Sequence, residues 1–154
     1  MTKSLIMPRR NFIKNVAVAG AVVSALPLFN VRAQSAGRKF KVGLVGCGGR
    51  GNEALQNMLE AAKTLGYEIE VYSVADFFPD RANGTAAKYN IPADRVFTGA
   101  TGYRQLVEQP IEIVLLATSP AFRPTHLEAA LKAGKHMFIE KPVAVDPVGA
   151  RKVM

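Results

Sequence analysis

The feature that most constrains this chain is a glycine-rich loop, Gly46–Gly51 (GCGGRG), placed directly between a strand and a helix. The segment before it, Lys39–Val45, is β-branched and apolar, as a buried parallel strand should be. The segment after it, Asn52–Leu65, has apolar residues at helical spacing. The loop fits G-x-G-x-x-G in the context in which that pattern binds a dinucleotide. A flexible glycine turn is the alternative interpretation.

Each glycine of this pattern has a physical task. Gly46 permits the tight turn, Gly48 lets the backbone approach a pyrophosphate, and Gly51 lets the helix pack closely on the strand. The amides at the helix start would then point at the anion. Arg50 could add a charge-assisted contact to phosphate or could be solvated. Cys47 is expected to pack as a small side chain, with a redox role as the alternative.

Asp76 follows the next predicted strand, 25 residues after Gly51. A carboxylate at this position can accept hydrogen bonds from the adenosine ribose and repel a 2′-phosphate, which favours NAD over NADP. Arg81 lies nearby and could accommodate that phosphate, so NADP stays open. The alternative is an ordinary strand-end carboxylate.

Strands and helices continue to alternate along the chain. Further strands are predicted over Ile69–Ala75, Arg95–Phe97, Ile111–Ala117 and His136–Ile139. Further helices are predicted over Arg81–Tyr89, Tyr103–Glu108 and Thr125–Ala133, with a last one capped by Asp146. This order predicts an α/β, Rossmann-type, doubly wound parallel sheet of about five strands.

Two turns that follow predicted strands are candidate parts of the site, because ligands bind beyond the carboxyl ends of parallel strands. One is Thr118, Ser119 and Pro120, expected beside the nicotinamide half of a dinucleotide. The other contains Glu140 and Lys141, and the lysine could stabilise the alkoxide that forms as hydride leaves. A salt-bridged surface pair of these two residues is the alternative.

Histidines and the single cysteine carry weaker signals. His126 falls in a helix, where histidine is more often structural than catalytic, and His136 at a strand start is expected to be structural. One cysteine excludes a disulfide framework and a cysteine-cluster metal site, so no metal is expected.

The charge distribution argues against a nucleic-acid binder in spite of the net charge of +8. The segment 1–33 holds five of the 20 basic residues and no acid, which leaves 15 basic and 12 acidic residues in the rest. The excess positive charge therefore belongs mainly to an N-terminal segment, and no basic binding face is indicated on the fold.

That segment, 1–33, has the pattern of a signal peptide with a signal helix. Arg9 and Arg10 precede an apolar run over Val16–Phe29, whose 14 residues are fewer than the roughly 20 of a membrane span. Val31-Arg32-Ala33 resembles a cleavage site, after which no stable span remains. The paired arginines resemble a twin-arginine signal, which predicts the twin-arginine export machinery as a partner and a periplasmic location. An ordinary Sec signal or an uncleaved anchor is the alternative.

The combination VGLVGCGGRG, VADFFPDRA, IVLLATSP…H and AGKHMFIEKP resembles the Gfo/Idh/MocA oxidoreductase family over Lys39–Met154. The resemblance implies binding of NAD or NADP by a nucleotide-binding domain over 38–154. It assigns this binding to Gly46, Gly48, Gly49, Gly51, Asp76 and the 118–120 turn, with Arg50, Glu140 and Lys141 also at the site. It implies a catalytic role for Lys141, with His126 as a second candidate, and a cis Lys141–Pro142 bond.

Family members also carry a second domain that binds substrate and aids oligomerisation. Nothing here corresponds to it, so the chain is expected to be a truncated part of a longer, homo-oligomeric protein. Three functions follow: an exported oxidoreductase acting on a sugar, cyclitol or related polyol; a glycosidase using bound NAD for oxidation and elimination; and a non-catalytic dinucleotide-binding module.

Overall fold

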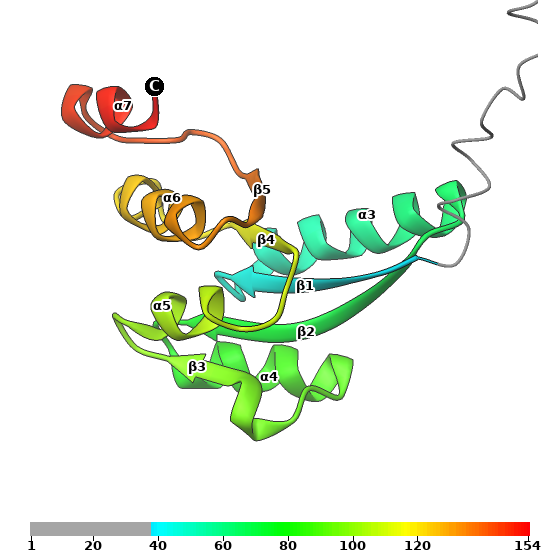
Figure 1. The fold of residues 1–154 in the computed structure, drawn as a ribbon. Coiled ribbons are helices and arrows are strands. Elements are labelled where there is room, and N and C mark those ends of the chain that lie inside the picture. The colour runs from blue at the N-terminus through cyan, green and yellow to red at the C-terminus, as the bar shows by residue number, and fades with distance from the viewer. Residues whose placement is uncertain (1–37) are drawn as a thin grey trace, which may run out of the picture. The chain divides into compact units, whose positions relative to one another are not determined.

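The computed structural model describes residues 38–154, which form one five-stranded sheet with helices on both faces (Figure 1). The strands are β1 (Lys39–Val45), β2 (Glu68–Asp76), β3 (Val96–Thr98), β4 (Ile113–Leu116) and β5 (His136–Ile139). The helices are α3 (Gly49–Leu65), α4 (Pro79–Tyr89), α5 (Gly102–Val107), α6 (Arg123–Lys132) and α7 (Pro147–Val153), with a 3₁₀ turn η1 (Ala93–Arg95).

The strand order is β3-β2-β1-β4-β5, and every neighbouring pair is parallel. The chain therefore runs outward from β1 to one edge and then returns past it to the other edge. This reversal lies between β1 and β4, where Val45 pairs with Leu116. Such a switch point is where doubly wound folds bind ligands. The predicted Rossmann-type α/β fold is confirmed.

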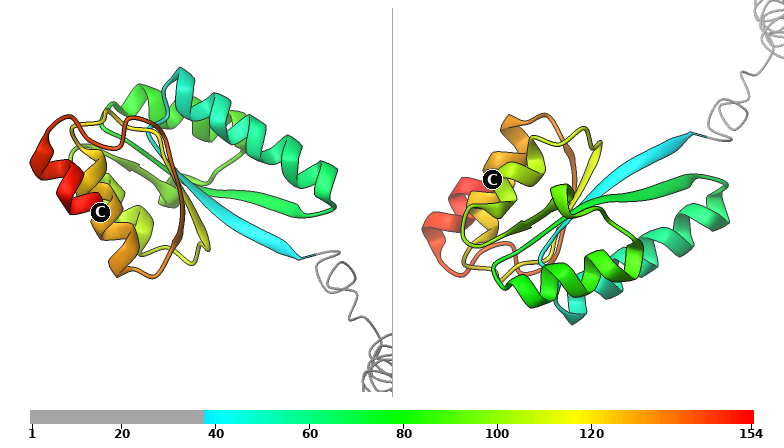
Figure 2. Two further views of the ribbon diagram at one scale, coloured as in Figure 1. Left: turned by 90° about the horizontal axis from the view of Figure 1, so that it is seen from above. Right: turned by 90° about the horizontal axis from the view of Figure 1, so that it is seen from below.

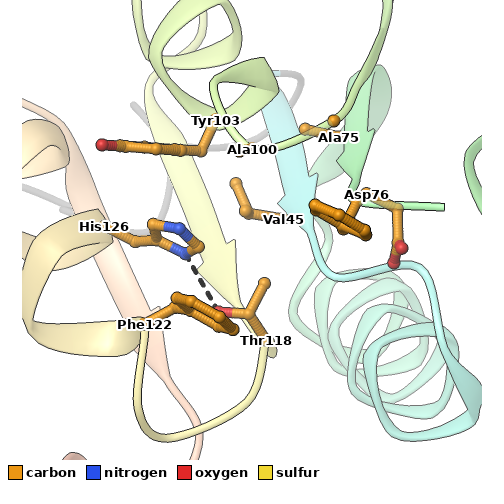
Figure 3. Close-up of a pocket in the computed structure, with 10 residues that line it drawn as sticks. Val45, Ala75, Asp76, Ala100, Tyr103, Thr118, Phe122 and His126 are labelled. Atoms are coloured by element: carbon orange, nitrogen blue, oxygen red, sulfur yellow. Dashed lines mark hydrogen bonds between the residues drawn. The ribbon is translucent and has the colours of Figure 1, made fainter.

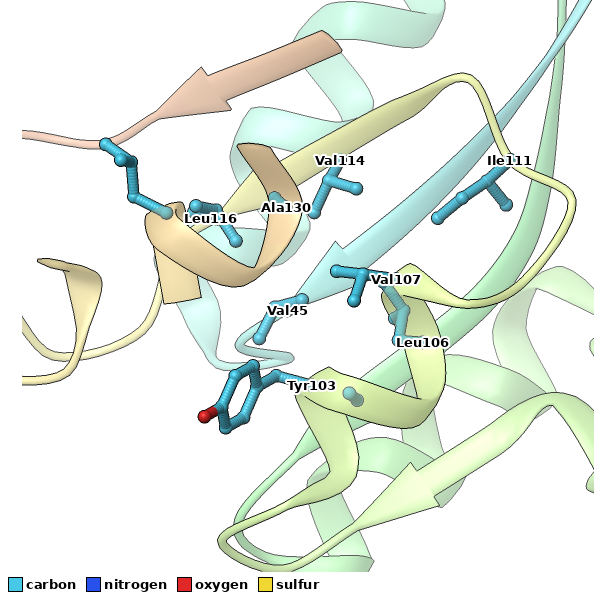
Figure 4. Close-up of a cluster of buried hydrophobic side chains, with 10 residues drawn as sticks. Val45, Tyr103, Leu106, Val107, Ile111, Val114, Leu116 and Ala130 are labelled. Carbon is cyan, nitrogen blue, oxygen red and sulfur yellow. The ribbon is translucent and has the colours of Figure 1, made fainter. Parts of the chain in front are cut away.

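Helices lie on both faces of the sheet (Figure 2), and the sheet separates two apolar cores. Helices α3 and α4 cover one face, where Leu55 and Ala86 pack on Leu44, Val74 and Leu115. The side chains on the other face come from α5, α6 and the strands, and Figure 4 shows how they interlock. The buried members of this second core are Val45, Ala75, Tyr103, Leu106, Val107, Ile111, Val114, Leu116, Leu127 and Ala130. Because strands β1 and β4 are covered on both sides, they are apolar without strict alternation.

Several element boundaries differ from those predicted. Helix α3 begins at Gly49 rather than Asn52, so the second half of the glycine loop is already helical. Helix α4 forms over 79–89 in spite of Asn83-Gly84, with Pro79 in its first turn. Strand β4 is shorter than predicted and begins at Ile113, although the Glu112 backbone is still hydrogen-bonded to Lys41 and His136 of the neighbouring strands.

The last helix begins as the sequence predicts. The Asp146 carboxylate accepts a hydrogen bond from the Gly149 amide at 2.7 Å, which is an N-cap of α7. Lys152 and Lys132 both pair with Glu128, so α7 is tied to α6. These two lysines lower the pKa of Glu128 to about 2.

The predicted signal peptide over 1–33 lies outside the described residues. Within 38–154, none of the helices combines the length and apolarity that crossing a bilayer would take.

Candidate nucleotide-binding site

The glycine loop is held against the sheet by its first and last glycines. Gly46 has φ +100°, and a Cβ there would lie 2.7 Å from the Ala117 carbonyl carbon and the Thr118 nitrogen. A Cβ on Gly51 would lie 1.8 Å from the Gly46 carbonyl oxygen. The tight turn predicted for Gly46 and the close helix packing predicted for Gly51 are therefore both confirmed.

The middle glycines face outward instead. A Cβ on Gly49 would meet nothing within 4 Å, and one on Gly48 would meet only the Arg81 guanidinium at 3.9 Å. Among residues 38–154, no side chain caps the start of α3, and no acidic residue occupies the first turn of this helix. The first amides of a helix have no intrahelical partners, so this opening presents unpaired N–H donors to an anion. The geometry fits the pyrophosphate of a dinucleotide.

Asn52 stabilises the glycine loop through side-chain hydrogen bonds to its backbone, a role not predicted from the sequence. Its amide nitrogen donates to the carbonyl oxygens of Cys47 and Gly48 at 2.7 and 3.2 Å. It also lies 3.1 Å from the hydroxyl of Thr85, a buried residue of α4. The sequence did carry a signal for this role, because Asn52 directly follows the last glycine. A polar side chain in the first turn of a helix can reach the backbone of the loop that precedes it.

Asp76 ends β2 next to this loop and is 8% exposed. Its carboxylate accepts hydrogen bonds from the backbone amides of Cys47 at 2.7 Å and Phe78 at 2.9 Å. The side chain thus joins the glycine loop to the start of α4. It also lines the cavity described below, so the carboxylate combines a structural task with a position at the candidate site.

Cys47 itself is buried, with its thiol 3.6 Å from the Ala75 carbonyl oxygen. Desolvation and the nearby Asp76 charge raise the pKa of this thiol to about 12. A thiol that stays protonated at neutral pH is a poor nucleophile, which favours the packing interpretation over a redox role.

A small cavity of about 120 Å³ opens beside Asp76 at the carboxyl ends of β1, β2 and β4 (Figure 3). Its walls are mostly apolar: Val45, Ala75, Phe77, Gly99, Ala100, Tyr103, Thr118, Phe122 and His126. Phe77 and Phe122 are 62% and 60% exposed. Exposed aromatic rings beside a cavity offer flat apolar surfaces to a planar ring. Thr118, predicted beside nicotinamide, lies in the same cavity as Asp76, the residue predicted to contact the adenosine ribose.

His126 forms one wall of this cavity between two aromatic rings. Its ring centroid lies 4.2 Å from that of Tyr103 and 6.2 Å from that of Phe122. Its Nδ1 is hydrogen-bonded to the Thr118 hydroxyl at 3.0 Å, the dashed line in Figure 3. Burial lowers the pKa of this imidazole to about 4, so it is neutral at pH 7. A neutral imidazole in this setting fits a cavity wall better than a proton donor.

The predicted turn after β5 lies at the same rim of the sheet. The Glu140 amide donates to Leu116, which places the turn beside the end of β4. Glu140 is 4% exposed, and its carboxylate pairs with Arg50 of α3 at 2.5 Å. Arg50 also pairs with Glu53, so its guanidinium contacts two carboxylates while its side chain remains about half exposed. The Arg50 hydrogen bond lowers the pKa of Glu140.

Lys141 is exposed at this rim. The alternative of a Glu140–Lys141 surface pair is not what the structure shows, because Glu140 is buried and pairs with Arg50. The predicted cis Lys141–Pro142 bond is present. In the turn after β4, Ser119 is exposed and its carbonyl accepts from the Phe122 amide, while Pro120 is half-buried.

Comparison with known proteins identifies the fold family. Residues 40–154 match the family described as "Oxidoreductase family, NAD-binding Rossmann fold", GFO_IDH_MocA. The chain belongs to this family. The predicted cofactor class, NAD or NADP, is that of the family.

Three relatives show the range of proteins that the chain resembles. An inositol 2-dehydrogenase from Ralstonia nicotianae is 32% identical, covering 75% of this chain and 32% of the relative. A glycosyl hydrolase family 109 protein from Phocaeicola vulgatus is 29% identical, covering 69% of this chain and 20% of the relative. A 3-ketoreductase from Actinomadura kijaniata, solved with NADP, superposes with a TM-score of 0.58 at 25% identity, covering 75% of this chain and 33% of that one.

The chain therefore spans about a third of the length of the curated inositol dehydrogenases it matches. The match covers the nucleotide-binding domain and carries the cofactor class.

Proposed function

We propose that this chain is the nucleotide-binding part of an NAD(P)-dependent oxidoreductase that acts on a sugar, cyclitol or related polyol. The observation that carries the proposal is the opening at Gly48–Gly49, which faces the uncapped start of α3. The salt bridge from Arg50 to Glu140 ties this opening directly to the turn that presents Lys141. The proposed phosphate-binding opening and the candidate catalytic Lys141 therefore lie along the same edge of the sheet, which we call the rim, and are linked by this salt bridge.

The residues of the rim divide the binding task between them. The amides at the start of α3 bind the pyrophosphate, and Gly48 and Gly49 leave its approach open. Asp76 and the aromatic cavity receive the adenosine half, with Phe77 and Phe122 beside the adenine ring. The side of the rim formed by Glu140 and Lys141 remains for the nicotinamide half and the substrate.

Lys141 is the proposed catalytic residue. Its exposed ammonium donates a hydrogen bond to the substrate hydroxyl and stabilises the developing alkoxide. Bound NAD(P)⁺ would supply the hydride acceptor, and a base contributed by the substrate domain of the parent protein would take the hydroxyl proton. The neutral His126 holds Thr118 in place and shapes the adenosine cavity, which makes it a positioning residue in this proposal.

NAD is the proposed preferred cofactor, because Asp76 places a carboxylate where a 2′-phosphate would lie. The Arg81 guanidinium lies close to Gly48 and 4.7 Å from the Phe78 ring. It could pair with the 2′-phosphate of NADP, so binding of NADP stays an alternative.

Calorimetric titration of the full chain with NAD⁺ and NADP⁺ tests the cofactor assignment. We expect one binding site and tighter binding of NAD⁺. In Asp76→Asn, which keeps the size of the side chain, the preference for NAD⁺ should narrow. If the ratio of NAD⁺ to NADP⁺ affinity is the same in wild type and Asp76→Asn, Asp76 does not determine the cofactor preference. A folded wild-type chain that binds neither dinucleotide would refute the proposal.

A second candidate function is a glycosidase that uses bound NAD for transient oxidation and elimination, favoured by the similarity to the glycosyl hydrolase from Phocaeicola vulgatus. The two functions differ in their products when the parent protein is assayed with polyols and glycosides. A dehydrogenase forms one NADH for each substrate molecule consumed, whereas the glycosidase turns over substrate without net NADH. Binding without either activity would indicate a dinucleotide-holding module.

We further propose that residues 1–33 direct export through the twin-arginine machinery to the periplasm, and that the parent protein is a homo-oligomer. Arg9 and Arg10 ahead of an apolar run support the export proposal. A folded reporter fused to residues 1–33 should reach the periplasm, and Arg9→Lys/Arg10→Lys should block it. Export of the double variant at the normal rate would favour the Sec pathway.

A further inference from the structure

A buried arginine stands behind the turn that presents Lys141. Arg123 is the first residue of α6 and is only 5% exposed. Desolvation lowers the pKa of this guanidinium, while the Glu140 charge opposes that effect. A charged side chain is costly to bury unless its surroundings supply hydrogen-bond partners. The partners of Arg123 therefore indicate what it does.

Both of its hydrogen bonds go to the main chain on either side of Lys141. Nη1 donates to the Glu140 carbonyl oxygen at 2.7 Å and to the Pro142 carbonyl oxygen at 2.5 Å. Nε has no partner among the described residues. One nitrogen atom thus clamps the residues before and after Lys141 and leaves the lysine side chain free.

A second arginine holds the same turn by its side chain. Arg50, in the first turn of α3, pairs with the Glu140 carboxylate at 2.5 Å. The turn is therefore fixed from α6 through its backbone and from α3 through Glu140. Because α3 begins inside the glycine loop, the second contact also sets the turn relative to the phosphate opening.

We propose that Arg123 is the positioning residue of the catalytic turn, holding the backbone at Glu140 and Pro142 so that Lys141 points at the reacting hydroxyl. Its assignment to catalysis rests on the proposed function of Lys141. The clamp itself rests on the hydrogen bonds alone. Arg123 touches neither cofactor nor substrate in this proposal and acts only through Lys141.

The test follows the Lys141 side chain in the full chain with lysine labelled biosynthetically at ¹³Cε, whose resonances report local surroundings without altering the ammonium groups. Lys141→Arg assigns the Lys141 signal, and exposed Lys63 of α3 serves as an internal reference. We expect wild-type Lys141 to give a signal resolved from that of Lys63 and to shift when NAD⁺ is added. In Arg123→Met, the Lys141 signal should move to within one linewidth of the reference, with the affinity for NAD⁺ changed less than twofold.

Arg123→Lys provides the rescue, because a single ammonium can donate to both carbonyls as Nη1 does. Its Lys141 signal should return to the wild-type position. Arg151→Met, which removes an exposed arginine of α7, is the matched control and should leave Lys141 unchanged. If Arg123→Met does not fold, Arg123→Gln, which retains one amide donor, replaces it with the same expected direction.

The outcomes separate the two proposals. An unchanged Lys141 signal in a folded Arg123→Met or Arg123→Gln protein overturns the positioning role, as does a wild-type Lys141 signal that coincides with Lys63. If an Arg123 variant loses thermal stability while its Lys141 signal stays at the wild-type position, Arg123 has only a structural role. Failure of wild-type protein to bind NAD⁺ would refute the proposed function, yet the cofactor-free Lys141 spectra would still decide for or against the clamp.

Discussion

The two sides of the candidate site are built in opposite ways. On one side, the glycine loop is shaped by the absence of side chains, since Gly46 and Gly51 pack directly against backbone atoms. On the other side, the turn at Lys141 is shaped by charged side chains, Arg123 and Arg50, which reach it from two helices. The first side has no room for an added atom at Gly46 or Gly51, whereas the second depends on particular hydrogen bonds.

This difference determines how each side should respond to mutation. Within the glycine loop, the packed positions should control folding and the open ones should control binding. At the Lys141 turn, removing a donor should disturb local placement before it disturbs the fold. The following variants test this contrast, beginning with the largest expected effect.

Gly51→Ala should break the packed part of the loop. Its Cβ would lie 1.8 Å from the Gly46 carbonyl oxygen, a backbone atom that cannot move without shifting β1 or α3. We expect the free energy of unfolding to fall by about 3 kcal/mol or more, enough to abolish folding in a domain of ordinary stability. Chemical denaturation measures this loss, and a variant as stable as wild type would show that the helix does not pack on the loop as described.

Gly48→Ala should leave the fold intact and weaken binding. Gly48 has φ −71°, which any residue adopts, and its Cβ would have only one neighbour, at 3.9 Å. We expect about tenfold weaker NAD⁺ binding, or about 1.4 kcal/mol, because the methyl group occupies the approach of the pyrophosphate. Calorimetry measures the affinity.

The matched control for this position is Gly84→Ala on α4, where an added Cβ would meet no described atom within 4 Å. It should stabilise the helix by up to about 1 kcal/mol and leave NAD⁺ binding unchanged. Equal affinities in the two alanine variants would contradict a phosphate site at Gly48.

Asn52→Ala should loosen the loop without filling it. It removes the hydrogen bonds to the Cys47 and Gly48 carbonyl oxygens and the contact with Thr85. We expect a loss of about 1–2 kcal/mol in the free energy of unfolding. Gln56→Ala, at an exposed position of the same helix, should change it by less than about 0.5 kcal/mol. Similar losses in both variants would exclude a bracing role for Asn52.

His126 should give an effect that is seen only as a pH dependence of stability below neutral pH. Its pKa is lowered to about 4 in the folded protein, against about 6.5 in an unfolded chain. Between these values the unfolded state binds more protons, so stability should fall as the pH drops from 6.5 towards 4, by at most about 1.4 kcal/mol per pH unit. His126→Phe should flatten this part of the profile, and an unchanged slope would show that the imidazole titrates normally.

Much of the fold and part of the site could be predicted from the sequence. Glycines at positions 46, 48 and 51 between a strand and a helix strongly indicate a dinucleotide-binding loop. This conformation depends only on which residues stand at a few neighbouring positions, so the sequence is enough to predict it. The strand-end positions of Asp76 and Glu140 followed from the same alternation of strands and helices. The cis bond at Lys141–Pro142 followed from the family resemblance.

The contacts that organise the site could not be predicted in this way. Arg123 bonds to carbonyl oxygens, which every residue carries, so no sequence pattern marks its partners. Glu140 was weighed as a partner of its neighbour Lys141, but its partner is Arg50, 90 residues away along the chain. Thr118 was predicted at the end of a strand and His126 in the following helix, and only the folded structure shows that both share a cavity with Asp76.

The central claim is that the open backbone at the start of α3 holds the diphosphate bridge of NAD(P). The most direct test is an amide ¹H–¹⁵N spectrum of the full chain recorded during titration with NAD⁺. We predict that the largest changes fall on the amides of Gly48, Gly49, Arg50 and Gly51, with a smaller set at Asp76 and Phe77. Saturable binding that leaves these amides unmoved would place the cofactor elsewhere and contradict the claim.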